Sequence, residues 1–169
     1  MSSRICSGAD FVAASLVGTD LSDRDLSHIT MHSADLRGAV LTQTDLNGAD
    51  LRNTRLTGAT LCGANLQNAN LEGAALKRAN LSDTILIVAC LRRADLRRAN
   101  LIGANLIGAD LRGANLAGAK IKWEQLRYAL ITNAVLPDGK IRDRKDVMFD
   151  APFATCLSEL FYGNRSVVI

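Results

Sequence analysis

The chain has 169 residues, of which 48% are hydrophobic but only 4% aromatic, so its core must be built mostly from small and aliphatic side chains. The formal net charge of +3 at pH 7 is too small to indicate nucleic-acid binding by itself. No stretch approaches the roughly 20 apolar residues of a membrane-spanning helix, and the start does not read as a secretory signal. We therefore expect a cytoplasmic protein whose four cysteines, without CxxC spacing, are reduced thiols.

Residues 1–10 precede the first clear repeat, and we expect them to cover the lower end of the fold as an N-terminal cap. From residue 11 to residue 136 an apolar residue recurs every five positions without insertion. We call these 26 positions centres, and 22 of them are leucine. The residue two before the centre is alanine in 19 units, and the residue just before it is Asp or Asn in 14. The chain is thus a five-residue repeat over most of its length.

A period of five fits neither an α-helix nor a flat strand. Within one unit, however, the alanine and the centre are two positions apart, so in extended chain both point to the same side. The next two residues must then turn the chain, and glycine occupies the second of them ten times. Each unit is therefore expected to be a short extended side followed by a corner, and successive units wind into a coil.

The segments Ala99-Asn100-Leu101, Ala104-Asn105-Leu106 and Ala109-Asp110-Leu111 spell the pattern A-(D/N)-L-x-x. The sequence resembles the pentapeptide-repeat family, and most closely its bacterial, cyanobacterial-type members. The resemblance implies an all-β solenoid, a right-handed quadrilateral β-helix with four units per coil. We expect about six to seven coils over residues 11–136, followed by a non-repetitive C-terminal cap or tail over residues 137–169 that could include one short helix.

Three places depart from the pattern. Arg24 stands where alanine is usual, and a charge facing inward is costly; we favour a locally distorted first coil over an arginine that reaches out of the open end. Glu124 also takes an inward slot, unless residues 123–126 form one helical turn that breaks the last coil. Pro137-Asp138-Gly139 is typical of a turn.

The segment from residue 140 to residue 169 is not repetitive. An amphipathic helix is expected over residues 151–162, capped by Asp150 and ended by Gly163. It could cover the upper edge of the column, since uncovered strand edges invite aggregation. We favour this cover over the alternative of a homodimer contact, with which it is compatible.

With four units per coil, residues 20 apart stack on one face. Two neighbouring faces then carry a run of cations in outward positions, which we call the arginine ridge. The arginine ridge consists of Lys77, Arg78, Arg92, Arg93, Arg97, Arg98 and Arg112. The other two faces carry an apolar patch in outward positions, which consists of Ile87, Val88, Ile102 and Ile107. Both sets are hypotheses for binding surfaces, although arginines can also simply keep a Leu/Ala column soluble.

The sequence offers no catalytic group, no cofactor site and no metal site. His28 and His32, the two histidines, read as solvated polar residues, and the glycines follow the repeat rather than a phosphate-binding spacing. The repeated aspartates, such as Asp95 and Asp110, are expected to accept hydrogen bonds from the backbone at the corners. An enzyme is therefore the least favoured function.

Three functions remain. The first is a non-catalytic scaffold that presents flat faces to a macromolecular partner, most simply another protein. The second is nucleic-acid binding by the arginine ridge, against which stands the near absence of exposed aromatic residues for base stacking. The third comes from the resemblance, because some members mimic DNA and bind DNA gyrase; that mimicry needs acidic faces, and this chain predicts a basic one.

Overall fold

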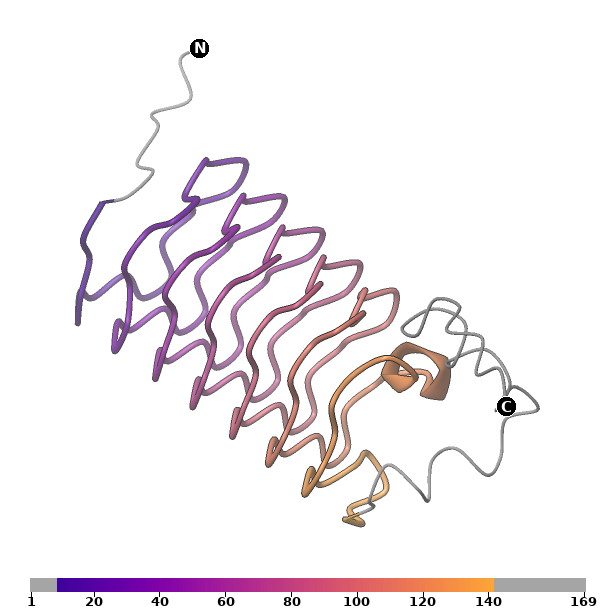
Figure 1. The fold of residues 1–169 in the computed structure, drawn as a ribbon. Helices are drawn as coiled ribbons and strands as arrows, with labels where there is room; N and C mark the ends of the chain where they lie inside the picture. The colour runs from indigo at the N-terminus through magenta and orange to yellow at the C-terminus, as the bar shows by residue number, and fades with distance from the viewer. Residues whose placement is uncertain (1–8, 142–169) are drawn as a thin grey trace, which may run out of the picture.

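The computed structural model describes residues 9–141, which form a column of stacked coils (Figure 1). Isolated parallel bridges join residues that are 20 positions apart, from Asp10↔Thr30 to Asn115↔Val135. Each bridge involves the residue just before a centre, so every side of the coil contributes one very short strand. Four five-residue units therefore complete one turn, and residues 20 apart lie directly above one another. We use "above" for the direction toward the C-terminal end.

The corners of the coil are hydrogen-bonded turns. The N–H group of the residue three after a centre donates to the carbonyl of that centre, as in Ala94 to Leu91 at 3.1 Å. The residue two after the centre has a positive φ, for example +69° at Gly108. A positive φ at the third turn position is the mark of a type II turn, and glycine adopts it without steric cost. The recurring glycine of the sequence is thus explained.

The interior of the column is filled by the centres and the alanines. Leucine centres such as Leu71 and Leu96 are 0% exposed, as is Ala74. Threonine replaces alanine inside the column at Thr54 and Thr84, and each hydroxyl donates to a backbone carbonyl at 2.7 Å. A buried hydroxyl is therefore tolerated because it has a partner.

All five N–H groups of a regular unit have an acceptor. In the unit from Asp95 to Ala99, the N–H groups of Asp95, Leu96 and Arg98 donate to neighbouring coils at 2.9, 2.8 and 3.0 Å. The N–H of Ala99 closes the turn at 3.0 Å. The remaining N–H, that of Arg97, donates to the Asp95 carboxylate at 3.1 Å. The prediction that the repeated aspartates bind backbone at the corners is confirmed, because the residue before the centre supplies the acceptor that the ladder lacks.

The first coil is regular, so the expected distortion at Arg24 is wrong. The turns and bridges continue through residues 21–30, and the Arg24 carbonyl accepts from the N–H of Asp45 at 2.9 Å. The Arg24 side chain is exposed. A long side chain in an end coil can reach water without moving the backbone, so the guanidinium leaves the interior and the ladder is kept.

The last coil is interrupted by η1, a 3-10 helix over Trp123–Leu126 (orange in Figure 1). The alternative of a helical turn at this place is confirmed, and the inward placement of Glu124 is wrong, since Glu124 is exposed. Within residues 9–141, Asn105 has no bridge to residue 125, although the preceding coils pair at this place. The coil resumes with the bridge from Asp110 to Leu130.

The two ends of the described segment differ slightly from expectation. Ala9 and Asp10 already belong to the ladder, which begins just before residue 11. The predicted turn at Pro137-Asp138-Gly139 is confirmed, because the N–H of Gly139 donates to the Leu136 carbonyl at 2.8 Å. The chain then reverses, and Ile141 pairs antiparallel with Val135. The expected helix over residues 151–162 lies outside the described residues. Among those described, no helix has the length and apolar character to cross a membrane.

Candidate functional site

The structure brings the arginine ridge together on two adjacent corners of the column. Arg112 lies above Arg92, and Arg97 lies above Lys77, as the inter-coil hydrogen bonds at these corners require. Arg98 likewise lies above Arg78. All of the ridge is exposed except the half-buried Lys77. The stacking expected from the 20-residue register is therefore present.

Several arginines of this surface are neutralised by their own unit. The guanidinium of Arg97 holds the Asp95 carboxylate with hydrogen bonds of 2.8 and 2.6 Å, and Arg112 holds Asp110 in the same way. Arg37 and Arg52 pair with the aspartates two positions before them, outside the ridge proper. The signal for this pairing was in the sequence as the recurring Asp-Leu-Arg, which sequence reasoning overlooked.

The arginine ridge therefore carries less uncompensated positive charge than its number of cations suggests. Among the described residues, Arg78, Arg93 and Arg98 have no ion pair, and Arg92 approaches Asp110 only to 3.9 Å. An arginine that already binds a carboxylate at two points must break that pair before it can bind a phosphate. This arrangement weakens the case for a nucleic-acid interface.

We expect Asp95→Asn to change stability by at most about 1 kcal/mol at pH 7, because the ion pair with Arg97 is exposed while the amide oxygen keeps the turn bond. The hydrogen bonds from Arg97 hold the pKa of Asp95 below its usual range. The folded state thus binds fewer protons, and this stabilisation is lost as the pH falls through the lowered folded pKa, below the unfolded value of about 3.9.

Denaturant unfolding at pH 7 and pH 3 checks this expectation. The stability difference between wild type and Asp95→Asn should shrink at pH 3. Asp95→Ala, which also removes the turn acceptor, should be less stable than Asp95→Asn at both values. A difference between wild type and Asp95→Asn that is equal at both pH values would contradict the assignment.

The apolar patch is larger than the sequence indicated. Ile102 and Ile107 are 41% and 52% exposed, and Ile87 is half-buried directly below Ile107. Val88 is 59% exposed. Three further side chains extend the patch, and we call the whole the apolar side. The added members are Ile85 at 38%, Trp123 at 44% and Tyr128 at 37% exposure. The last two were missed because the effect of the helical turn on the surface was not considered.

The apolar side and the arginine ridge lie on opposite faces of the coil. The ridge flanks the face with centres Leu76 and Leu96, and the apolar side flanks the face with centres Leu86 and Leu106. These faces are two units apart in a coil of four. The column therefore presents a charged face and an apolar face back to back.

Val88 is held in a strained conformation on the apolar side. Its φ is +58°, and among the described residues it is the one β-branched side chain with a positive φ. The left-handed region is a genuine outlier for such a residue. Because the side chain is 59% exposed, packing within the column does not compensate for the strain. Strain that serves no packing purpose is a physical pointer to a surface role.

We expect Val88→Gly to stabilise the column by about 0.5–1 kcal/mol, because relief of the left-handed strain exceeds the entropic cost of glycine. Arg93→Gly is the matched control, since Arg93 occupies the same turn position with a similar φ of +57° but is not β-branched. Its gain should be smaller. Guanidinium chloride unfolding measures both, and a lower stability for Val88→Gly than for Arg93→Gly would refute the assignment of strain.

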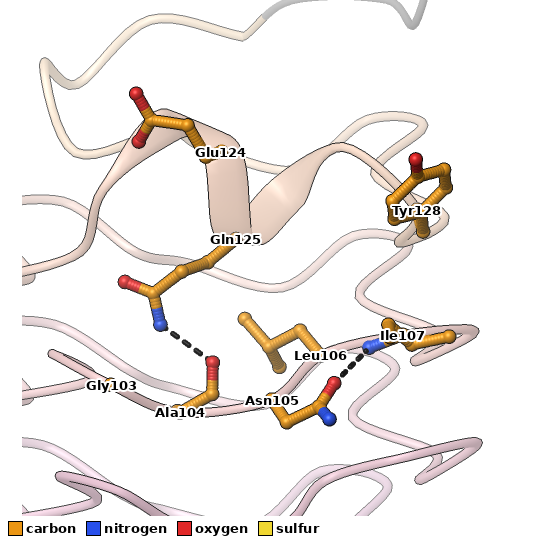
Figure 2. Close-up of a pocket in the computed structure, with 8 residues that line it drawn as sticks. All are labelled: Gly103, Ala104, Asn105, Leu106, Ile107, Glu124, Gln125 and Tyr128. Atoms are coloured by element: carbon orange, nitrogen blue, oxygen red, sulfur yellow. Dashed lines mark hydrogen bonds between the residues drawn. The ribbon is translucent and has the colours of Figure 1, made fainter. Parts of the chain in front are cut away.

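The apolar side is hollowed beneath η1. Figure 2 shows this open groove, with the backbone of the preceding coil as its floor and η1 as its roof. It is lined by Gly103, Ala104, Asn105, Leu106, Ile107, Glu124, Gln125 and Tyr128. The side-chain amide of Gln125 donates to the carbonyls of Leu101 and Ala104 at 2.7 and 2.6 Å.

The described residues hold no cluster of three or more potential metal ligands. Cys62 and Cys90 are free, half-buried thiols, and the hydroxyl of Ser82 lies 3.4 Å from the Cys62 sulfur. Cys6 and Cys156 lie outside the described residues. His28 packs its ring near Gly48 rather than beside a second ligand.

The sequence matches the family described as Pentapeptide repeats over residues 5–43, 44–83 and 89–123, with eight copies. The chain belongs to the pentapeptide-repeat family. Members of this family form right-handed β-helices, in agreement with the stacked coils of Figure 1. A search of curated proteins gave no match.

Solved pentapeptide-repeat structures are similar to this chain. Full-length QnrB1, a plasmid-mediated fluoroquinolone resistance protein, is 21% identical over 80% of this chain and 78% of its own, with a TM-score of 0.50. HetL, which is involved in heterocyst differentiation regulation in the cyanobacterium Nostoc, is 30% identical over 80% and 86%, with a TM-score of 0.29. Rfr23 from the cyanobacterium Cyanothece is 27% identical over 76% and 91%, with a TM-score of 0.33. The likeness to QnrB1 is one of fold.

Proposed function

We propose that this pentapeptide-repeat protein is a non-catalytic scaffold that binds another protein through its apolar side. The scaffold would be a quadrilateral β-helix of about six to seven coils, a count that the 20-residue bridge register supports. The single observation that carries the proposal is Val88, which is strained and exposed at the corner that also carries the exposed Ile107. Contiguous exposed apolar side chains are typical of protein-binding surfaces.

The column itself offers a comparison for this surface. The position occupied by Ile87 and Ile107 is occupied by Asn47 and Gln67 in the coils below, at the same corner. Polar residues therefore suit this position structurally. The change to isoleucine in the upper coils is not required by the fold, which supports a contact role.

The experiment compares partners captured by the immobilised full chain and by Ile107→Gln/Val88→Gly. The glutamine copies Gln67, and the glycine relieves strain, so the double variant should fold at least as well as wild type. Arg93→Gln/Arg98→Gln serves as the control on the opposite face. We expect the apolar-side variant to lose partners that wild type and control retain. Recovery of the same partners at the same yield by all three proteins would overturn the proposal.

Nucleic-acid binding by the arginine ridge is the alternative, supported by the unpaired Arg78, Arg93 and Arg98. A duplex titration at about 50 and 200 mM salt separates it from the scaffold, because phosphate contacts lose affinity steeply with salt. Binding that is abolished in Arg93→Gln/Arg98→Gln would favour the alternative. Gyrase binding by DNA mimicry ranks below both, because the likeness to QnrB1 at 21% identity concerns the fold and the ridge is basic.

A further inference from the structure

Two backbone donors are left without partners beneath η1. In units with centres from Phe11 to Leu116, the N–H of the centre and that of the residue two after it donate to the coil above. The exceptions are the N–H groups of Leu106 and Gly103, which have no acceptor within residues 9–141. Leu106 is only 1% exposed, whereas Gly103 is exposed, and both line the groove. Buried N–H groups are rarely left unpaired.

The cause is the replacement of a strand by η1. The Lys122 carbonyl, which would accept from Gly103 in a regular coil, accepts instead from the N–H of Gln125 inside η1 at 3.1 Å. That N–H is therefore no longer available to the Ala104 carbonyl. The side chain of Gln125 takes over this bond at 2.6 Å, as Figure 2 shows. The Ala104 carbonyl on the floor of the groove is thus satisfied by a side chain, while the N–H groups of Gly103 and Leu106 have no acceptor.

The open donors are three residues apart and lie on either side of the end of a coil corner. In the coil below, the equivalent N–H groups of Asp83 and Leu86 donate to the carbonyls of Ile102 and Asn105 at 3.0 and 2.9 Å. Those two carbonyls are three residues apart on a segment that turns at Ile102 and Gly103 and is extended at Asn105. A peptide that turns as a repeat unit does can therefore present the same pair of carbonyls to Gly103 and Leu106, in a variant of strand addition to a sheet edge.

The walls of the groove fit an aliphatic side chain. Ile107 and Tyr128 are exposed beside it, and the guanidinium of Arg127 lies 5.6 Å from the centre of the Tyr128 ring. Glu124 on the roof is exposed. Because the rim carries both an acid and a base, its charge does not select a strongly charged ligand. Selection would rest on backbone hydrogen bonds and on apolar contact.

We propose that the groove beneath η1 binds a peptide segment of a partner protein that adopts the turn and short strand of a repeat unit, and so completes the side of the coil that η1 displaces. The carbonyls of the peptide accept from Gly103 and Leu106, and an aliphatic side chain packs on Ile107 and Tyr128. A peptide N–H takes the Ala104 carbonyl, so the Gln125 side chain is a placeholder that the peptide displaces. This inference rests on the proposed scaffold function and names its class of partner.

The test uses the full chain and one probe, an acetylated and amidated peptide with the sequence of residues 101–108 and two added lysines for solubility. Amide NMR signals of Gly103 and Leu106 should shift on titration, and their exchange with solvent should slow. Gln125→Ala removes the competing side chain, so it should bind the peptide several-fold more tightly. Trp123→Gly/Glu124→Ala/Gln125→Asn restores the repeat pattern and fills the groove, so it should bind at least ten-fold more weakly.

The test distinguishes failure of the groove as the binding site from failure of the proposed scaffold function. Equal affinity in wild type and in the triple variant would overturn the groove as the site, as would weaker binding by Gln125→Ala. Slow exchange of the Gly103 and Leu106 amides in the free full chain would also overturn the proposal, since it would mean that the chain itself or a second copy fills the groove. Peptide binding alongside unchanged partner capture by Ile107→Gln/Val88→Gly would refute the proposed function without refuting the groove.

Discussion

Replacing Leu96 by alanine should destabilise the column by about 2–5 kcal/mol, the range found when a buried leucine is truncated and leaves a cavity. Leu96 is 0% exposed and lies between coils above and below. Each coil of a solenoid contacts only its neighbours, so a cavity in the middle weakens two interfaces at once. Denaturant unfolding of the full chain measures the loss.

Two controls define the origin of that loss. Leu96→Ile keeps the volume and should cost less than about 1.5 kcal/mol. Leu21→Ala makes the same chemical change in the first coil, where the side chain is only half-buried, and should cost clearly less than Leu96→Ala. Equal losses for Leu21→Ala and Leu96→Ala would contradict a column held together by stacking.

Restoring the repeat at η1 should stabilise the protein by about 1–3 kcal/mol. Trp123→Gly/Glu124→Ala/Gln125→Asn gives the last coil the glycine, alanine and asparagine of a regular unit. The N–H of the exposed Gly103 and that of the buried Leu106 would then find acceptors, and leaving a buried donor such as that of Leu106 unpaired costs about 1–3 kcal/mol. Thermal and denaturant unfolding of the variant and wild type provide the measurement.

The single variant Trp123→Gly is the control for this expectation. It supplies the turn glycine but leaves a glutamate at the position that a regular coil would turn inward, so the coil cannot close and no gain in stability should follow. A triple variant that is less stable than wild type would show that η1 is better for folding than a regular unit. The interruption would then need no functional explanation.

Much of the fold could be predicted because a five-residue repeat is compatible with few backbone conformations. Leu96 and Ala94 could be assigned to the interior from their spacing alone, since extended chain directs residues two apart to one side. Stacking the units buries what a single unit cannot, and the register of 20 then places Ile107 above Ile87. Asp95 could be assigned to the corner because a carboxylate there can accept from the N–H that the ladder between coils leaves unpaired.

The predictions that were wrong or incomplete had a common cause. Each depended on the direction that a side chain takes once the backbone is fixed. Arg24 was expected to distort the first coil, but a flexible side chain reaches water more cheaply than a ladder breaks. The ridge was read as a sum of charges, whereas Asp95 binds Arg97 and Asp110 binds Arg112. Repeat position gives the location of a side chain but not its partner.

The sequence by itself determined the column, its corners, and the placement of the arginine ridge and the apolar patch on different faces. The reason is that a strict five-residue period requires every unit to repeat the same backbone conformation. Only the tertiary structure decided what the break at residues 123–126 does. A helical turn was foreseeable from those residues, but its consequence falls some 20 positions earlier, on the N–H groups of Gly103 and Leu106. Hydrogen bonds between coils join residues that are distant in sequence, so the groove belongs to the stacked structure and not to any local pattern.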